Sequence, residues 1–239
     1  MKRNVSSTKV MIWVCLIFLV VVGVRSASNY YVMSEARHIE LGNRLYGPGL
    51  AAEQIPKFSA NPKLTFSHIG LGMFYLLLGC LQFSEKIRKK YRKLHRYMGR
   101  VFAVIAVIIG TSGLIIGYEY AYTGWQEVFP VTLFGFMYLL FLGLAIDSIR
   151  NKNVNAHREW MIRHFSIGLA AAGTIRLFIV AGNVWLDLSP NEFVPTAFWL
   201  AFTSHVIVAE IWIQRSRSAK LKSGNKRRFE NSSYTGAYG

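Results

Sequence analysis

The residues of this chain that could do chemistry are histidines and arginines placed inside, or at the ends of, long apolar runs. His95 and His157 each stand where a basic stretch gives way to an apolar run. His164 lies seven residues after His157, on the same face of a helix. His68 lies in an earlier run, and Arg176 lies late in the run that follows His157. Ionisable groups at membrane depth are costly, so each is a functional hypothesis by default.

These side chains form two groups when their depth is taken from a rise of about 1.5 Å per residue. One group lies next to the basic loops, at the predicted inner face of a membrane. Its members are His95, Arg96, Arg100, His157, Arg163, His164 and Glu210. The other group is His68 with Arg176, near the predicted outer boundary. We predict that these groups bind a cofactor or a substrate.

The first chemical hypothesis is a b-type haem in the inner group. Two imidazoles from different helices can ligate one iron. Their nitrogens must lie about 4 Å apart across the metal, since metal–nitrogen bonds are near 2 Å. His95 with His157 or His164 meets the condition of equal depth, and the neighbouring arginines could pair with haem propionates. His68 could pair only with His205, which is about 9 Å deeper, so an outer haem has less support.

Structural roles are the alternative for every one of these residues. Arginines near a membrane boundary can reach lipid phosphates with the head group and cover apolar surface with the stem. Glu210 could form an ion pair with a neighbouring arginine. Histidines in a helix bundle often hydrogen-bond across helices and do nothing else.

Six apolar runs must position these side chains. They cover residues 10–24, 64–83, 97–118, 128–149, 160–184 and 194–213, and they predict about six membrane-spanning helices. The first run is short enough to be the core of a signal peptide. Arg25 lies where a cleavage site after Ala27 would need a small residue, so we expect an uncleaved helix.

The distribution of cations predicts the orientation of the chain. The formal net charge is +16, and the positive charges gather at 84–96, 150–158 and 215–228, whereas 119–127 and 187–192 contain none. Cytoplasmic loops of membrane proteins carry an excess of Lys and Arg. We therefore predict a multi-pass protein of the cell (inner) membrane with both termini cytoplasmic. The same distribution argues against nucleic acid as a partner and makes the lipid bilayer the expected surrounding.

The predicted fold class is an all-α, polytopic membrane helix bundle with four parts. Residues 1–26 form an N-terminal anchor helix, and residues 27–63 form an extracytoplasmic loop with a short helix near 34–42. Residues 64–215 form a multi-helix membrane domain, and residues 216–239 form a basic, disordered cytoplasmic tail. Two cysteines inside apolar runs give no disulfide framework.

Two motifs carry most of the inner group, and shorter pieces surround them. The motifs are Leu94-His95-Arg96-Tyr97-Met98-Gly99-Arg100 and His157-Arg158-Glu159-Trp160-Met161-Ile162-Arg163, and the shorter pieces are His68-Ile69-Gly70, Gly79, Gln82-Phe83, Arg88, Gly113, Arg176 and Ala209-Glu210. With these pieces, residues 64–215 resemble the DUF2306 family of uncharacterised predicted membrane proteins. The resemblance implies a multi-helix membrane domain and supplies no activity. In that family serine and asparagine are more usual at His164 and His205. A distant likeness to cytochrome b561 lies in architecture and histidine placement, which is analogy alone.

Two functions are compatible with these observations. The first is transmembrane electron transfer by a haem held between the third and fifth spans, with a quinone or another membrane redox protein as partner. The alternative is a small transporter or lipid-interacting accessory subunit in which His68, Arg176 and Glu210 handle substrate or protons. No Gly-x-Ser-x-Gly, His-Glu-x-x-His or phosphate-binding glycine loop occurs, so no pattern assigns a hydrolytic reaction.

Overall fold

The computed structural model describes residues 3–235. All regular structure in that range is helical. In chain order the elements are α1 (Arg3–Val32), α2 (Glu35–Tyr46), α3 (Leu50–Ala60), α4 (Pro62–Thr65), the π-helix η1 (Phe66–Gly70), α5 (Leu71–Phe83), α6 (Glu85–Lys90), α7 (Arg92–Glu119), α8 (Trp125–Arg150), α9 (Val154–Leu169), the π-helix η2 (Ala170–Thr174), α10 (Ile175–Leu186) and α11 (Pro190–Thr235).

Six stretches of the described residues are long and apolar enough to cross a membrane. They are α1, the run α4–η1–α5, α7, α8, the run α9–η2–α10, and the first part of α11. The predicted all-α bundle of about six spans is therefore confirmed. Each observed helix extends past its apolar run, because flanking polar residues continue a helix once it has begun.

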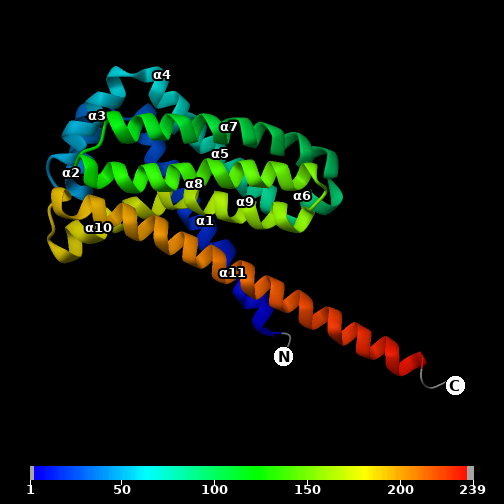
Figure 1. Ribbon diagram of the computed structural model, residues 1–239. Helices are drawn as coiled ribbons and strands as arrows, with labels where there is room; N and C mark the ends of the chain where they lie inside the picture. The colour runs from blue at the N-terminus through cyan, green and yellow to red at the C-terminus, as the bar shows by residue number, and fades with distance from the viewer. Residues whose placement is uncertain (1–2, 236–239) are drawn as a thin grey trace.

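The spans form a bundle around α8 and α9. Helix α8 packs against α7 and α9, and α11 packs against α8, α9 and α10. Figure 1 shows α7, α8 and α9 side by side, α1 crossing them obliquely, and α11 continuing past the bundle. Helices α2 and α3 cover one end, which we call the α2–α3 end, and α6 lies at the opposite or α6 end. The basic segments 84–96 and 150–158 both lie at the α6 end, whose assignment to the cytoplasm stays a prediction.

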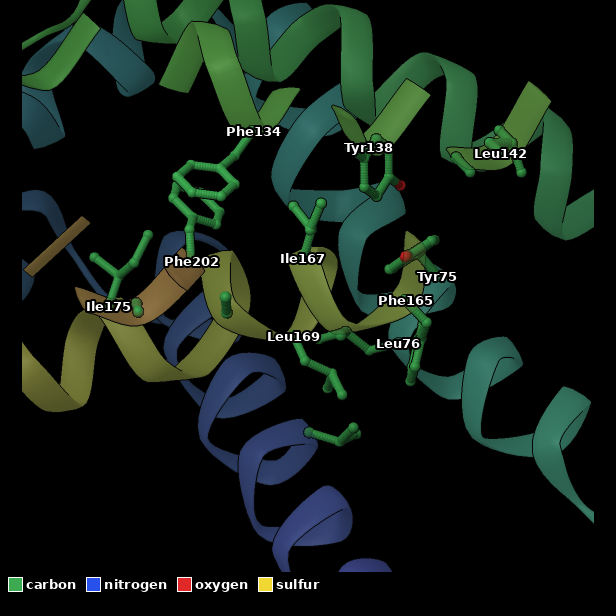
Figure 2. Packing of buried hydrophobic residues seen from close by; sticks show 14 of the residues in the cluster. Tyr75, Leu76, Phe134, Tyr138, Leu142, Phe165, Ile167, Leu169, Ile175 and Phe202 are labelled. Carbon is green, nitrogen blue, oxygen red and sulfur yellow. The ribbon is translucent and has the colours of Figure 1, made fainter. Parts of the chain in front are cut away.

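Aromatic rings and small residues hold the spans together. Phe134 of α8 stacks on Phe202 of α11 with ring centroids 4.7 Å apart (Figure 2). Gly79 of α5 lies against the ring of Phe165, where a Cβ atom would come within 2.1 Å. Without a hydrophobic driving force between helices in lipid, such close approaches supply the packing energy.

The segment between the first two spans differs from the predicted loop. Helix α1 continues to Val32, and α2 and α3 fill most of the remainder. The ring of Phe58 on α3 makes edge-to-face contacts with Tyr30 and Tyr120. These contacts join α3 to the ends of α1 and α7, so tertiary packing stabilises helices whose polar composition resembles a loop.

The C-terminal segment also differs from the predicted disordered tail. Helix α11 continues without a break from the membrane span to Thr235. Lysine, arginine and serine in this segment permit a helix, and extension of an existing helix avoids the cost of nucleation. Residues 236–239, also part of the predicted tail, lie outside the described residues.

Candidate functional site: a cavity between two π-helices

A cavity of about 310 Å³ lies inside the half of the bundle that is closer to the α2–α3 end. Residues of α1, α3, η1, α5, α7, α8, α9, η2, α10 and α11 line it. Seven glycines contribute to its wall: Gly23, Gly72, Gly110, Gly113, Gly117, Gly135 and Gly168. Its polar lining residues are Tyr30, Gln54, His68, Tyr75, Tyr120, Glu127, Tyr138 and Arg176. A concave, mainly apolar space with few polar groups is typical of small-molecule sites, and this volume is at the lower end of their range.

Both π-helices of the structure border this cavity. His68 belongs to η1, and Arg176 follows η2 by two residues. A π-turn inserts an extra residue into a helix and is frequent at functional sites. The Arg176 guanidinium donates from Nη1 to the carbonyl oxygens of Ala171 and Ala172, each at 2.9 Å. Its Nε donates to Ser26 of α1 at 2.8 Å. The arginine therefore folds back along η2 and fixes α1 to it.

His68 is held in one orientation by α7. Its Nδ1 lies 3.2 Å from the carbonyl oxygen of Ile109 and 3.3 Å from the Ser112 hydroxyl. Because a carbonyl oxygen only accepts hydrogen bonds, Nδ1 carries the proton and Nε2 keeps a lone pair. A Cβ atom at Gly113 would come within 2.8 Å of His68 Cε1, so glycine is what lets the ring lie against α7.

Arg176 is the positive charge of the cavity wall. Among the ion pairs of the described residues none involves Arg176. Glu127, the acid of the wall, accepts from the backbone amides of Tyr122 and Thr123 at 2.9 and 3.3 Å. Those hydrogen bonds hold the turn before α8, so the Glu127 carboxylate pairs with backbone amides and not with Arg176. The arginine charge is thus left without a carboxylate partner in the described part of the chain.

The positive charge of Arg176 also acts on a histidine of α2, at the α2–α3 end of the bundle. His38 of α2, outside the spans, contacts the Tyr30 ring edge-on with centroids 4.5 Å apart. Burial and, after it, the Arg176 charge lower the pKa of His38 below its usual value of 6.5. This histidine is therefore held in its neutral form near neutral pH.

Two tyrosines of the cavity wall, Tyr75 and Tyr138, contact His164 behind it. His164 is fully buried, and its Nδ1 donates to the backbone oxygen of Tyr138 at 2.9 Å. Its Nε2 therefore accepts, and the Tyr75 hydroxyl donates to it at 3.2 Å. The Tyr138 side chain is buried beside that of Tyr75, with ring centroids 6.0 Å apart. Figure 2 shows Tyr75 and Tyr138 reaching toward each other from α5 and α8.

Two histidines of the predicted inner group come together near the α6 end. The imidazoles of His95 and His157 lie close enough to interact electrostatically. His157 Nδ1 donates to the backbone oxygen of Ala145 at 2.8 Å, and His95 Nδ1 is buried without a partner among the described residues. His205, the proposed partner of His68, instead contacts the Thr174 hydroxyl through Nε2 at 2.8 Å.

The other members of the inner group take separate positions. Arg163 and Glu210 form a two-bond ion pair between α9 and α11, with Nη2 3.0 Å from Oε2, and Arg163 stacks on Trp160 at 4.5 Å. This pairing is the structural alternative expected for Glu210. Arg96 and Arg100 are exposed on α7. Within the described residues no three His, Cys, Asp or Glu side chains are placed to share a metal ion. A haem needs only two protein ligands, so the haem stays a prediction.

The sequence predicted that His68 and Arg176 lie at a similar depth in the membrane, and both line the cavity. It did not single out Tyr75, Tyr138 or the π-turns. A tyrosine within an apolar run gives no functional signal until the rotation of its helix is known. The two π-turns could not be recognised from the local sequence.

One comparison with known proteins bears on this site. The family described as predicted membrane protein (DUF2306) matches residues 65–213. No curated protein and no solved structure matches the chain. The matched region begins at Thr65, the last residue of α4, and ends within α11, and of the spans that line the cavity only α1 lies wholly outside it. The match covers more than half of the chain, which therefore belongs to the DUF2306 family of predicted membrane proteins.

Proposed function

We propose that this membrane protein binds a small, largely apolar molecule in the cavity, with an oxygen-bearing head held at Arg176 and His68. The observation that carries the proposal is a guanidinium without a carboxylate partner in the wall of an apolar cavity of about 310 Å³. A charge in an apolar surrounding is costly unless it is paired, so a ligand oxygen at this point would be stabilised.

The two polar groups can do complementary chemistry. Arginine offers several N–H donors in a fixed fork and binds carboxylate or carbonyl oxygens. His68 Nε2 offers a lone pair, because Nδ1 is committed to the backbone oxygen of Ile109. A ligand hydroxyl could donate to His68, or give it a proton, while the resulting negative charge is stabilised by Arg176. This is the substrate or proton handling expected of a small transporter or a lipid-interacting subunit.

The ligand's apolar part has a matching environment. Gly72, Ile109, Leu114 and Phe198 line the cavity, and no Cβ neighbour fills the space at Gly72. Membrane-soluble molecules could therefore enter from the bilayer and bury their hydrocarbon portion between the helices. Glu210, which the sequence grouped with these residues, forms its ion pair with Arg163 elsewhere and has no part in this site.

Equilibrium dialysis of detergent-purified protein tests the proposal. The probes are decanoate, a small amphipathic anion, and duroquinone, a compact neutral molecule with carbonyl oxygens, with empty micelles as the blank. We expect at least one probe to bind, and Arg176→Gln to weaken it by about tenfold or more, since hydrogen bonds to charged groups contribute about 1.5–3 kcal/mol. Arg96→Gln, which removes an exposed arginine, should leave binding unchanged. Failure of both probes to bind, or equal binding by Arg176→Gln, would overturn the proposal.

A second function has its own observation in its favour. His157 donates Nδ1–H to a backbone oxygen, which is the arrangement that orients a metal-ligating imidazole, and the nearby His95 has an unpartnered ring nitrogen. These features support b-type haem ligation by His95 and His157, with electron exchange to a quinone or another membrane redox protein.

An absorption spectrum tests the haem proposal. Protein produced with ample haem should show a sharp reduced α-band that disappears in His95→Ala and in His157→Ala. His38→Ala, at the opposite end of the bundle, is the matched control and should retain the band. Protein that stays colourless in the presence of ample haem would contradict electron transfer through this pair.

A further inference from the structure

Two nitrogens of the cavity wall remain free to bind a ligand. Arg176 commits Nε to Ser26 and Nη1 to carbonyl oxygens of η2, which leaves Nη2 without a partner among the described residues. His68 commits Nδ1 to α7, which leaves Nε2. The two side chains lie close enough to interact electrostatically, both line the cavity, and neither free nitrogen is enclosed by protein atoms. The wall therefore offers a charged donor and a neutral acceptor to one head group.

The hydroxyls of Tyr75 and Tyr138 are already satisfied by protein groups. The Tyr75 hydroxyl donates to His164 Nε2, and the Tyr138 hydroxyl is hydrogen-bonded to that of Tyr75. Because Tyr75 gives its only hydrogen to His164, Tyr138 is the donor in the second bond. His164 in turn donates Nδ1–H to a backbone oxygen, so the series of bonds ends inside the protein. These two tyrosines therefore need no ligand oxygen.

The satisfied tyrosines lie about two helical turns from the free nitrogens, toward the α6 end. Tyr75 follows His68 along η1 and α5, and its hydroxyl packs on Gly168, which precedes Arg176 along α9, η2 and α10. The cavity lining also includes the apolar side chains of Leu76, Ile167, Phe198 and Phe202. A ligand with its polar group at Arg176 therefore meets hydrocarbon and aromatic walls along the rest of its length.

We propose that the cavity takes an amphipathic monocarboxylic acid, with its carboxyl group at Arg176 and His68 and its hydrocarbon chain beside the tyrosines. This inference rests on the proposed function and names the class of its ligand. A carboxyl group has two oxygens that accept from arginine and one acidic hydrogen, so it matches Arg176 Nη2 and His68 Nε2 together. An alcohol brings the hydrogen without the charge, and an ester or a quinone brings neither. A single polar head also fits a cavity whose two inner tyrosines are satisfied.

Probes that share one hydrocarbon chain isolate the contribution of the head group. Equilibrium dialysis of the wild-type protein compares decanoate, methyl decanoate and 1-decanol, with empty micelles as the blank. Decanoate should bind about tenfold more tightly than either neutral probe, because hydrogen bonds to charged groups are stronger than those between neutral groups. Methyl decanoate or 1-decanol binding as tightly as decanoate would overturn the inference. This comparison needs no variant, so it does not depend on how a substitution affects folding.

Arg176→Gln should remove the preference for the carboxylate. Decanoate binding should weaken by about tenfold, whereas methyl decanoate binding should change by less than about twofold. Arg96→Gln, which removes an exposed arginine of α7, is the matched control and should retain the full preference. An undiminished preference in Arg176→Gln would overturn the inference. Duroquinone binding that depends on Arg176, without decanoate binding, would also overturn it while the proposed function stands. Failure of both decanoate and duroquinone to bind would remove the proposed function and this inference together.

Discussion

Gly113→Ala should destabilise the protein and release His68 from its orientation. A methyl group at this position would come within 2.8 Å of His68 Cε1, well inside the 3.4–4 Å of ordinary contact. The imidazole would have to move away from α7, and the bond from Nδ1 to the Ile109 oxygen would stretch or break. Crowding of this kind costs about 1–3 kcal/mol.

Two smaller terms modify the cost of Gly113→Ala. Loss of the His68–Ile109 hydrogen bond adds about 0.5–1.5 kcal/mol. Replacement of a helical glycine by alanine gives back about 1 kcal/mol. The net expectation is a loss of about 1–3 kcal/mol in unfolding free energy. Thermal unfolding of the purified protein, followed by loss of helical circular dichroism, would measure its direction and size.

Gly143→Ala is the matched control for this substitution. Gly143 lies on the exposed face of α8, and a Cβ atom there would meet no atom within 4 Å. It should therefore raise stability by about 0.5–1 kcal/mol through helix propensity alone. The two variants make the same chemical change with opposite expected signs. If Gly113→Ala stabilised the protein as Gly143→Ala does, the assigned packing of His68 on α7 would be refuted.

Three further substitutions test the described contacts by thermal unfolding. Tyr75→Phe should cost about 1–3 kcal/mol because the buried His164 Nε2 loses its donor, and a midpoint equal to that of the wild type would contradict this bond. Glu210→Gln should lower the unfolding free energy by only about 1 kcal/mol, because the Glu210 side chain is 39% exposed and its ion pair with Arg163 is therefore screened. An unchanged midpoint would show that this ion pair does not contribute to stability. The depressed pKa of His38 means that the unfolded chain binds more protons, so stability should fall as the pH drops below about 6.5, and His38→Gln should reduce that fall. An identical pH profile for His38→Gln would argue against that role.

The spans could be predicted from the sequence because the bilayer imposes a minimum apolar length. The predicted run at 64–83 matches the observed span Pro62–Phe83 to within a few residues. Helices α2 and α3 could not be found in this way. Their stability depends on contacts such as those of Phe58 with Tyr30 and Tyr120, whose sequence separation hides them from a local pattern.

The candidate site was accessible from the sequence only in part. Counting residues along two helices places His68 and Arg176 at similar depth, and both line one cavity. The same count grouped His164 with Arg163 and Glu210, but adjacent residues point to different faces of a helix. His164 turns inward to Tyr75, whereas Arg163 turns to α11. Rotation about the helix axis, which depends on long-range packing, decides these partners.

The occupancy of the cavity is the central claim, and Gly72→Leu tests it most directly. Gly72 lines the cavity and has open space at its Cβ position, so leucine adds bulk there without removing a polar contact. Gly143→Leu places the same side chain on the exposed face of α8. Equilibrium dialysis of duroquinone and decanoate against both variants should show binding reduced at least tenfold by Gly72→Leu and unchanged by Gly143→Leu. Binding by Gly72→Leu at wild-type affinity would contradict a ligand site in this cavity.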